Sequence, residues 1–356
     1  MSDIVEHVAD EDPGSRSGRA QELPPELEEL KVIPSYQCAR GCFYCYNTLL
    51  NQTRQADPLT QRKKLLETMA NAPRRLTVEI IGGEPLEPGV FEQTVEYLTL
   101  LRGHSRSAKI VVSTAVAASL PLQRILPFVD RVYLSIDASA STRNRKRITE
   151  ARLRQLAELF ESHDVELIGS VVLFGDESAD ELQTFVDLAV RSGLRAIGFS
   201  HRTATSLDLN ERERYVDQYY ELFRLRLAWQ GTIRIGGAML ESLEIHFAGG
   251  YRVASCECGV TSMVLEPDGR LGMGICFDNH DYHPDAVNEF RSLKSERERT
   301  LKETPPCSTC ALWDVCRGGC VGEASQHAGD PMARAPLHCT LLRGVAARVQ
   351  ADSVAS

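Results

Sequence analysis

Between Leu30 and about residue 230, short apolar runs alternate with longer stretches in which apolar residues recur every three or four positions. The short runs predict buried strands, and the longer stretches predict amphipathic helices. Six strands alternating with helices predict an α/β fold in which right-handed crossovers wind a parallel sheet. The predicted strands are 30–35, 76–82, 108–114, 131–137, 165–173 and 194–200, and the predicted helices are 60–72, 90–102, 150–162, 179–192 and 210–229.

Residues that can carry chemistry stand at or just after several of these strands. Cys38 follows the first strand, Gly82 and Thr114 end the second and third, and Asp137 ends the fourth. In parallel α/β sheets, ligand sites form at the C-terminal ends of the strands. We therefore expect these residues to share one site.

The two ends of the chain differ in composition from this alternating region. Residues 1–26 are rich in acidic residues, Ser, Gly and Pro, which predicts a disordered leader. After residue 235, glycines and short apolar runs accompany eight of the eleven cysteines, with one helix-like stretch near 286–302. We expect a barrel domain over 27–235 and a second domain over 236–356, with too little regular core to fold well without bound metal.

Composition and charge argue against several classes of protein. The chain has 356 residues, of which 43% are hydrophobic and 25% charged, and its net charge of −9 argues against a non-specific nucleic-acid binder. No apolar run is long enough for a membrane span, and the N-terminus does not resemble a signal peptide. Eleven cysteines, an odd number in tight clusters, favour metal ligands over disulfides. We expect a cytoplasmic protein.

The first cysteine cluster is Cys38-x3-Cys42-x2-Cys45. Thiolates are the ligands that iron–sulfur clusters select, so three of them can hold three irons of one [4Fe–4S] cube. The fourth iron is then open to a small molecule. The alternative is three apolar cysteines on one buried helix face, but Gly41 and the preceding strand favour a loop. With Tyr44 just before the third cysteine, this spacing resembles the cluster loop of the radical S-adenosylmethionine (SAM) enzymes.

A second motif, Gly82-Gly83-Glu84-Pro85, ends the second strand. Paired glycines let the backbone approach a ligand closely, and Glu84 can accept a hydrogen bond from an ammonium group. By itself the motif is also typical of a plain strand-to-helix turn. One strand after the cysteine loop, it resembles the radical SAM motif that holds the amine of SAM. The resemblance implies that SAM chelates the open iron and is cleaved by one electron to a 5′-deoxyadenosyl radical.

The same resemblance implies further SAM contacts. Thr114, Ser135 and Asp137 would bind its ribose and carboxylate, although the family usually has Asn and Gly where this chain has Ala115 and Ala138. Arg147, in the basic run 143–147, would meet the SAM carboxylate. The alternative for this run is the solvated basic start of a helix.

The C-terminal cysteines resemble the SPASM domain that follows many radical SAM barrels. They stand as Cys307-x2-Cys310-x5-Cys316-x3-Cys320 and then Cys339, while Cys256, Cys258 and Cys276 flank a predicted β-hairpin with Asp268-Gly269 at its turn. The resemblance implies two auxiliary [4Fe–4S] clusters, one on Cys256, Cys258, Cys276 and Cys320 and one on Cys307, Cys310, Cys316 and Cys339. The alternative is a pair of zinc sites.

Together these features predict a partial (β/α)6 TIM-like barrel followed by a small SPASM domain. The resemblance implies an oxidoreductase that abstracts hydrogen from a peptide or protein side chain, leading to a crosslink, an oxidation or an epimerisation. It also implies an external electron donor of flavodoxin or ferredoxin type, and a candidate base at Asp278. The alternatives are a surface loop at Asp278, a small-molecule dehydrogenase or epimerase of aminoglycoside or cyclitol type, and a non-catalytic zinc-binding scaffold.

Overall fold

The structure is a computed structural model, and the residues described from it are 27–40, 42, 56–72, 76–104, 108–116, 118–136, 148–201, 208–251, 258, 261–273 and 284–355. The strands form one sheet in the order β7-β6-β5-β4-β3-β2-β1-β8-β9. All neighbouring pairs are parallel except β8 and β9. The strands are β1 (Glu29–Val32), β2 (Thr77–Ile80), β3 (Lys109–Thr114), β4 (Arg131–Ser135), β5 (Glu166–Leu173), β6 (Ala196–His201), β7 (Arg234–Gly236), β8 (Ser262–Leu265) and β9 (Leu271–Gly272).

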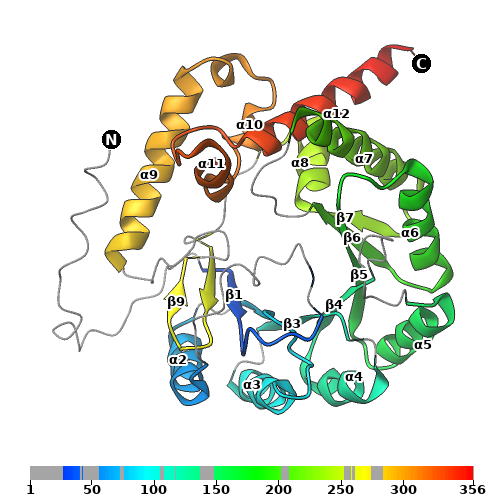
Figure 1. Ribbon diagram of the computed structural model, residues 1–356, viewed down its shortest axis with the longest axis vertical. Coiled ribbons are helices and arrows are strands. Elements are labelled where there is room, and N and C mark those ends of the chain that lie inside the picture. Colours follow the sequence, from blue (N-terminus) through cyan, green and yellow to red (C-terminus); the bar gives the residue numbers. More distant parts are fainter. Residues whose placement is uncertain are drawn as a thin grey trace.

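Helices α2 to α7 surround the outer face of this curved sheet (Figure 1). The helices are α2 (Pro58–Asn71), α3 (Phe91–His104), α4 (Ser119–Ile125), α5 (Glu150–Glu161), α6 (Ala179–Arg191), α7 (Leu209–Ala228), α8 (Ala238–Phe247), α9 (Pro284–Glu303), α10 (Trp313–Cys316), α11 (Val321–Ala328) and α12 (Pro336–Ala355), with 3-10 turns η1 (Leu126–Phe128) and η2 (Cys307–Thr309). The sheet does not close on itself, which confirms the predicted partial barrel.

The predicted elements all occur, with ends shifted by a few residues. Two elements of the barrel were missed, α4 and β7, and so were four helices of the C-terminal region, α8, α10, α11 and α12. Helix α4 has seven residues, too few to reveal a helical period, and β7 has three. Short segments such as these carry too little local pattern to be predicted.

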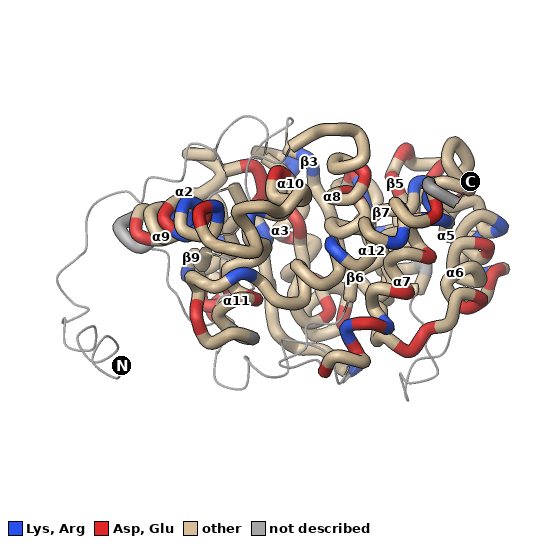
Figure 2. The backbone as a smooth tube through the Cα atoms, turned by 90° about the horizontal axis from the view of Figure 1, so that it is seen from above, with Lys and Arg blue, Asp and Glu red and all other residues tan. Residues whose placement is uncertain are grey.

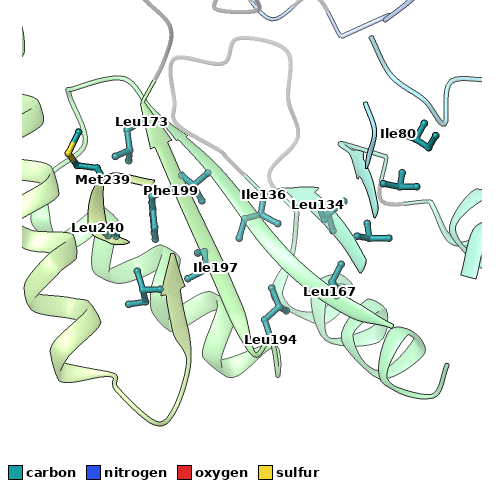
Figure 3. Packing of buried hydrophobic residues seen from close by; sticks show 14 of the residues in the cluster. Ile80, Leu134, Ile136, Leu167, Leu173, Leu194, Ile197, Phe199, Met239 and Leu240 are labelled. Atoms are coloured by element: carbon teal, nitrogen blue, oxygen red, sulfur yellow. The ribbon is translucent and has the colours of Figure 1, made fainter. Parts of the chain in front are cut away.

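The hydrophobic core lies between the sheet and its outer helices (Figure 3). On β4, Val132 and Leu134 are fully buried against the helices, whereas Arg131, Tyr133 and Ser135 alternate with them and stay partly accessible. Alternate residues of a strand point to opposite faces. The inner face of the barrel therefore carries polar side chains, and the outer face carries the core.

The C-terminal region continues the barrel. The β8–β9 hairpin turns at Gly269, which has a φ of +86°, as its predicted Asp268-Gly269 turn requires, and β8 pairs in parallel with β1. Helix α12 packs along α7 (Figure 1). A Cβ added at Gly344 would lie 2.7 Å from Val216 on α7, so this glycine permits the close approach.

This region has more regular core than the sequence predicted, and its dependence on bound metal stays a prediction. Leu337, Leu341, Leu342 and Val345 are buried and belong to the same hydrophobic cluster as the barrel. Burying the apolar face of α12 against the barrel stabilises this region at about 25 cal/mol per Å² of apolar surface.

Charges of both signs are spread over the outer helices (Figure 2). Acidic and basic positions are interspersed on α9, whereas α6 carries three acidic residues and one basic residue, Arg191, at its end. Over the part of the chain that the structure describes, no helix is both long and apolar enough to cross a membrane. The predicted disordered leader, residues 1–26, lies outside the described residues.

Candidate SAM and iron–sulfur sites

The glycine pair after β2 packs against the segment that leads into the first cysteine. Gly83 N donates to Ser35 O at 3.0 Å, and Glu84 N donates to Gln37 O at 2.9 Å. A Cβ on Gly83 would lie only 2.1 Å from Gln37 O. The glycine is thus required for one stretch of backbone to approach another. This contact fixes Glu84 beside the cysteine loop.

The Glu84 carboxylate is 2% exposed and fully oriented by its neighbours. Its Oε1 accepts from Thr114 Oγ1 at 2.5 Å and from Leu86 N at 3.1 Å, and its Oε2 accepts from Ala115 N at 2.8 Å. Thr114 Oγ1 in turn accepts from Val116 N. Two donors at the end of β3 and one in the turn after β2 therefore hold one buried acceptor in a single orientation.

The cysteine loop supplies the opposite charge. Arg40 lies between Cys38 and Cys42, and its Nε is 3.5 Å from Glu84 Oε2. Cys38 is exposed and Cys42 is partly buried. The structure thus joins the two sequence motifs into one site at the C-terminal strand ends, and adds Arg40, which the sequence analysis did not single out.

Of the other predicted SAM contacts, some are placed by the structure and the rest lie outside the described residues. Thr114 reaches the site through Glu84, and Pro85 is buried next to it, with its carbonyl accepting from Thr94 Oγ1. Ser135 lies on the inner face of β4, in register with Ser170 of β5. Tyr44, Cys45, Asp137 and Arg147 lie outside the described residues, so their roles stay predictions.

A charged group lines the barrel interior, and sequence reasoning missed it. Lys31 on β1 is in register with Glu79 on β2, and Ser113 Oγ donates to Glu79. Burial raises the pKa of the Glu79 carboxyl, and Lys31 and Ser113 offset part of that rise. Burial lowers the pKa of Lys31, but the nearby Glu79, Glu29 and Cys258 raise it by more. The signal was available as a polar residue at an alternate position of two otherwise apolar strands.

The hairpin from the C-terminal region is tied to this site. Tyr36 OH donates to Glu266 at the end of β8, and Gln61 Nε2 donates to Ile33 O at 2.7 Å and to Glu266 O at 2.8 Å. Both bonds connect the hairpin to the segment before the cysteine loop. The β8–β9 hairpin and the segment before the first cysteine loop are therefore held in one framework.

Four C-terminal cysteines line one small cavity. They are Cys307, Cys310, Cys316 and Cys339, contributed by η2, α10 and α12. Cys320 is not among the residues lining this cavity. This grouping matches the set that the sequence resemblance implied. Of the other set, Cys256 and Cys276 lie outside the described residues.

Local backbone features hold these cysteines in place. Arg317, Gly318 and Gly319 have φ values of +44°, +84° and +73°, which turns the chain sharply between Cys316 and Cys320. Arg297, which is fully buried, donates to the carbonyls of Gly318 at 2.6 Å and Gly319 at 3.0 Å. It also donates to Ala333 O at 2.8 Å, next to the start of α12. This buried guanidinium joins the two loops that carry the cysteines.

The four thiols share one cavity without converging on one point. Among the described residues, no three His, Cys, Asp or Glu side chains lie close enough together to share one metal ion. A four-iron cube binds each thiolate through a different iron, so its ligands stand further apart than those of one zinc. Burial, with the neighbouring Cys339, Cys310 and Cys307, raises the pKa of Cys316 to about 12. Four thiolates here need a compensating positive charge.

Comparison with known families identifies the barrel. Residues 32–189 match the model of the radical SAM superfamily, a span that contains the cysteine loop, Glu84 and Thr114. The chain carries a radical SAM domain. None of the curated proteins matches the chain.

Solved structures with the same fold extend beyond that domain. SuiB of Streptococcus suis bound to S-adenosylmethionine is 17% identical with a TM-score of 0.63, covering 89% of this chain and 77% of its own. The protein anSMEcpe with bound AdoMet is 18% identical with a TM-score of 0.67, covering 89% and 95%. SuiB bound to its precursor peptide SuiA matches at 16% identity, with a TM-score of 0.56 and coverage of 89% and 76%. Similarity at this level establishes the fold of the radical SAM domain together with the C-terminal region.

Proposed function

We propose that this protein is a radical SAM enzyme that modifies a peptide or protein side chain through hydrogen abstraction. The observation that carries the proposal is the buried Glu84 carboxylate, held beside the Cys38–Cys42 loop by hydrogen bonds from three donors. A buried carboxylate with acceptor capacity left is the partner that an ammonium group requires.

Each residue of the first site would have its own role in binding the cluster or SAM. Cys38, Cys42 and Cys45 would hold a [4Fe–4S] cluster, and Glu84 would bind the amine of SAM. When bound, the cluster and SAM supply the electron and the 5′-deoxyadenosyl radical that abstracts hydrogen. Thr114 orients the Glu84 carboxylate through its hydroxyl. Gly83 keeps this carboxylate next to the cluster loop, because only glycine fits against Gln37 O.

The barrel interior would receive the substrate. Lys31, Glu79 and Ser113 give it a polar lining that can hydrogen-bond a peptide backbone or a polar side chain. The fold is shared with SuiB, whose structure contains its precursor peptide, and with anSMEcpe, whose structures contain bound peptides. These relatives favour a peptide over a small-molecule substrate.

The C-terminal cysteines would hold two auxiliary clusters, as in SPASM domains. Support for one of them is the single cavity lined by Cys307, Cys310, Cys316 and Cys339. Such a cluster can accept the electron that an oxidised substrate releases, and an external flavodoxin- or ferredoxin-type protein would supply electrons to the first site. Free thiols and iron–sulfur clusters suit the reducing cytoplasm.

The test is a reaction under anaerobic conditions with SAM, a reductant and a short peptide encoded beside the gene of this protein. With the reaction run in deuterated buffer, we expect 5′-deoxyadenosine together with a changed peptide mass. Loss of two hydrogens would indicate a crosslink or an oxidation, and uptake of solvent deuterium would indicate epimerisation. Formation of 5′-deoxyadenosine with an aminocyclitol substrate, but with no peptide, would contradict the peptide assignment.

A further inference from the structure

A second buried carboxylate, Glu79, lies close to Glu84 on the two strands that carry the first site. Ser113 and Thr114 are consecutive residues of β3, and their hydroxyls donate to Glu79 and to Glu84 respectively. Consecutive Cα atoms are about 3.8 Å apart, so neighbouring points of one strand hold the two carboxylates. On β2, Glu79 precedes Ile80 of the hydrophobic core, so its side chain points to the opposite face, the barrel interior.

Glu79 is 9% exposed, yet it accepts far fewer hydrogen bonds than Glu84. Glu84 accepts from three donors, whereas Ser113 is the one donor to the Glu79 side chain within the described residues. Lys31 stands in register with Glu79 on β1, but its Nζ pairs with Glu29 at 3.5 Å. A carboxylate has about four lone-pair directions, so Glu79 can still accept a hydrogen bond or a proton from a ligand.

The charges around Glu79 favour such a proton. Lys31 and Glu29 face it from β1, and β3 faces it with Ser113 and the apolar Val111. Burial, together with the negative charge of Glu29, raises the pKa of the Glu79 carboxyl, and Lys31 and Ser113 lower it by less. A carboxyl with a raised pKa exchanges its proton closer to neutral pH than an ordinary glutamate, as a general base requires.

We infer that Glu79 accepts the proton that a peptide substrate loses when it is oxidised. The 5′-deoxyadenosyl radical takes one hydrogen atom from a C–H bond, and the substrate radical then gives one electron to an auxiliary cluster. Glu79 takes the proton of an adjoining N–H, O–H or S–H group, whose heteroatom forms a new bond to that carbon. The substrate has then lost two hydrogens. This inference rests on the proposed function, which supplies the radical and the electron acceptor.

The inference also selects between the proposed reactions. Oxidation and crosslinking release a proton and need an acceptor, whereas epimerisation returns a hydrogen atom to the same carbon and needs none. Cys258, a predicted ligand of an auxiliary cluster, and Glu79 both act electrostatically on Lys31. The electron and the proton are thus received on groups that share one lysine. Glu79 takes the role that sequence resemblance gave to Asp278, which lies outside the described residues.

The protonation of Glu79 can be measured without substrate, by infrared spectroscopy of the anaerobically reconstituted protein across a range of pH. We expect one carboxyl band, present in wild type and absent from Glu79→Gln, to titrate above the ordinary range of a glutamate. In Lys31→Met this band should titrate at still higher pH, because the cation that lowers the pKa of Glu79 is gone. A Glu79 band that titrates in the ordinary range would overturn the inference.

The reaction itself gives the second measurement, with SAM, a reductant and the peptide encoded beside the gene. Glu79→Gln should still form 5′-deoxyadenosine, but the product formed per 5′-deoxyadenosine should fall by about a hundredfold, the size of a general-base effect. In wild type, product formation should rise with pH through the pKa of Glu79. In Lys31→Met this rise should move to higher pH.

Thr77→Val is the matched control, because Thr77 lies two residues before Glu79 on the same face of β2. It should keep the product yield and the pH profile of wild type. The double variant Lys31→Met/Glu79→Gln removes the lysine together with the carboxylate, so it leaves no buried lysine without its partner. It should bind SAM like wild type and form as little product as Glu79→Gln.

Three results would overturn the inference. Equal loss of 5′-deoxyadenosine and product in Glu79→Gln would mean that Glu79 only supports the SAM site. Normal product and an unchanged pH profile in Glu79→Gln, with both lost in Asp278→Asn, would give the proton to Asp278. An epimerised wild-type product would remove the need for an acceptor and leave the proposed function intact. Failure of the proposed function looks different, because wild-type protein would then form no 5′-deoxyadenosine at all.

Discussion

The two cysteine sites of this protein differ in what surrounds the sulfur atoms. Beside Cys38 and Cys42 stand a buried carboxylate, an arginine and backbone donors, and Cys38 is exposed. Around the C-terminal cavity the four cysteines are all partly buried, and the cavity lining includes Leu312, Trp313 and Leu342 together with Arg334 and Arg343. The first site therefore offers a ligand access and a buried carboxylate, and the second encloses its sulfur atoms among apolar and basic side chains.

This difference assigns different tasks to the two sites. Binding and cleaving a charged cofactor requires an open metal position and groups that orient the ligand. Holding an electron requires a cluster whose potential is set by its burial and its neighbours. We therefore expect variants of the first site to abolish SAM chemistry, and variants of the second to abolish product formation while SAM cleavage continues.

The largest effect should come from the first cysteine loop. Replacing Cys38, Cys42 and Cys45 together by Ala should remove about four of about twelve irons and eliminate 5′-deoxyadenosine. Iron analysis and chromatography of the reaction measure both. A triple variant that still makes 5′-deoxyadenosine would move SAM cleavage to another site.

Cys310→Ala should affect the functions of the two sites differently. We expect it to lose iron and product formation but to keep SAM binding and slow SAM cleavage, because the barrel holds its own cluster and core. Since α12 is packed into the barrel core, resistance to protease should fall mainly around η2 and α10.

Ser308→Ala is the matched control for that variant, because Ser308 is exposed and lies between Cys307 and Cys310. It should keep full iron content and full turnover. A Cys310→Ala protein with normal turnover on its true substrate would make this cysteine dispensable and leave Cys256, Cys258, Cys276 and Cys320 as the functional set.

Glu84→Gln should weaken SAM binding by about ten- to a hundredfold, because an ammonium loses a charge-assisted partner worth about 1.5–3 kcal/mol. Glu87→Gln, three residues further in the same turn, should bind SAM normally. Equal SAM affinities of the two variants would mean that the glycine motif is only a structural turn.

Gly83→Ala should lower the free energy of unfolding by about 2–3 kcal/mol, since its Cβ would meet Gln37 O at 2.1 Å. Gly103, near the end of α3, has nothing within 4 Å of an added Cβ. Gly103→Ala should therefore stabilise the protein by up to about 1 kcal/mol. Urea unfolding of both variants measures the contrast, and equal stabilities would mean that the motif does not pack tightly on the cysteine loop.

Much of the fold and part of the candidate site could be predicted from the sequence, and particular residues show why. The strands and long helices follow from apolar periodicity, and the meeting of Cys38 with Glu84 follows from the rule that parallel strands share one C-terminal edge. The pairing of Arg40 with Glu84 did not follow, because it depends on the path of a single loop. The core around α12 was missed because its partner α7 lies far earlier in the chain.

The central claim is that the site joining Cys38, Cys42, Cys45 and Glu84 cleaves SAM reductively. The most direct test is to reduce the reconstituted wild-type protein under anaerobic conditions with SAM and to quantify 5′-deoxyadenosine and methionine. The account predicts both products in equal amounts, and none of either from the triple cysteine variant. Intact SAM after reduction of a protein with its full iron content would contradict it.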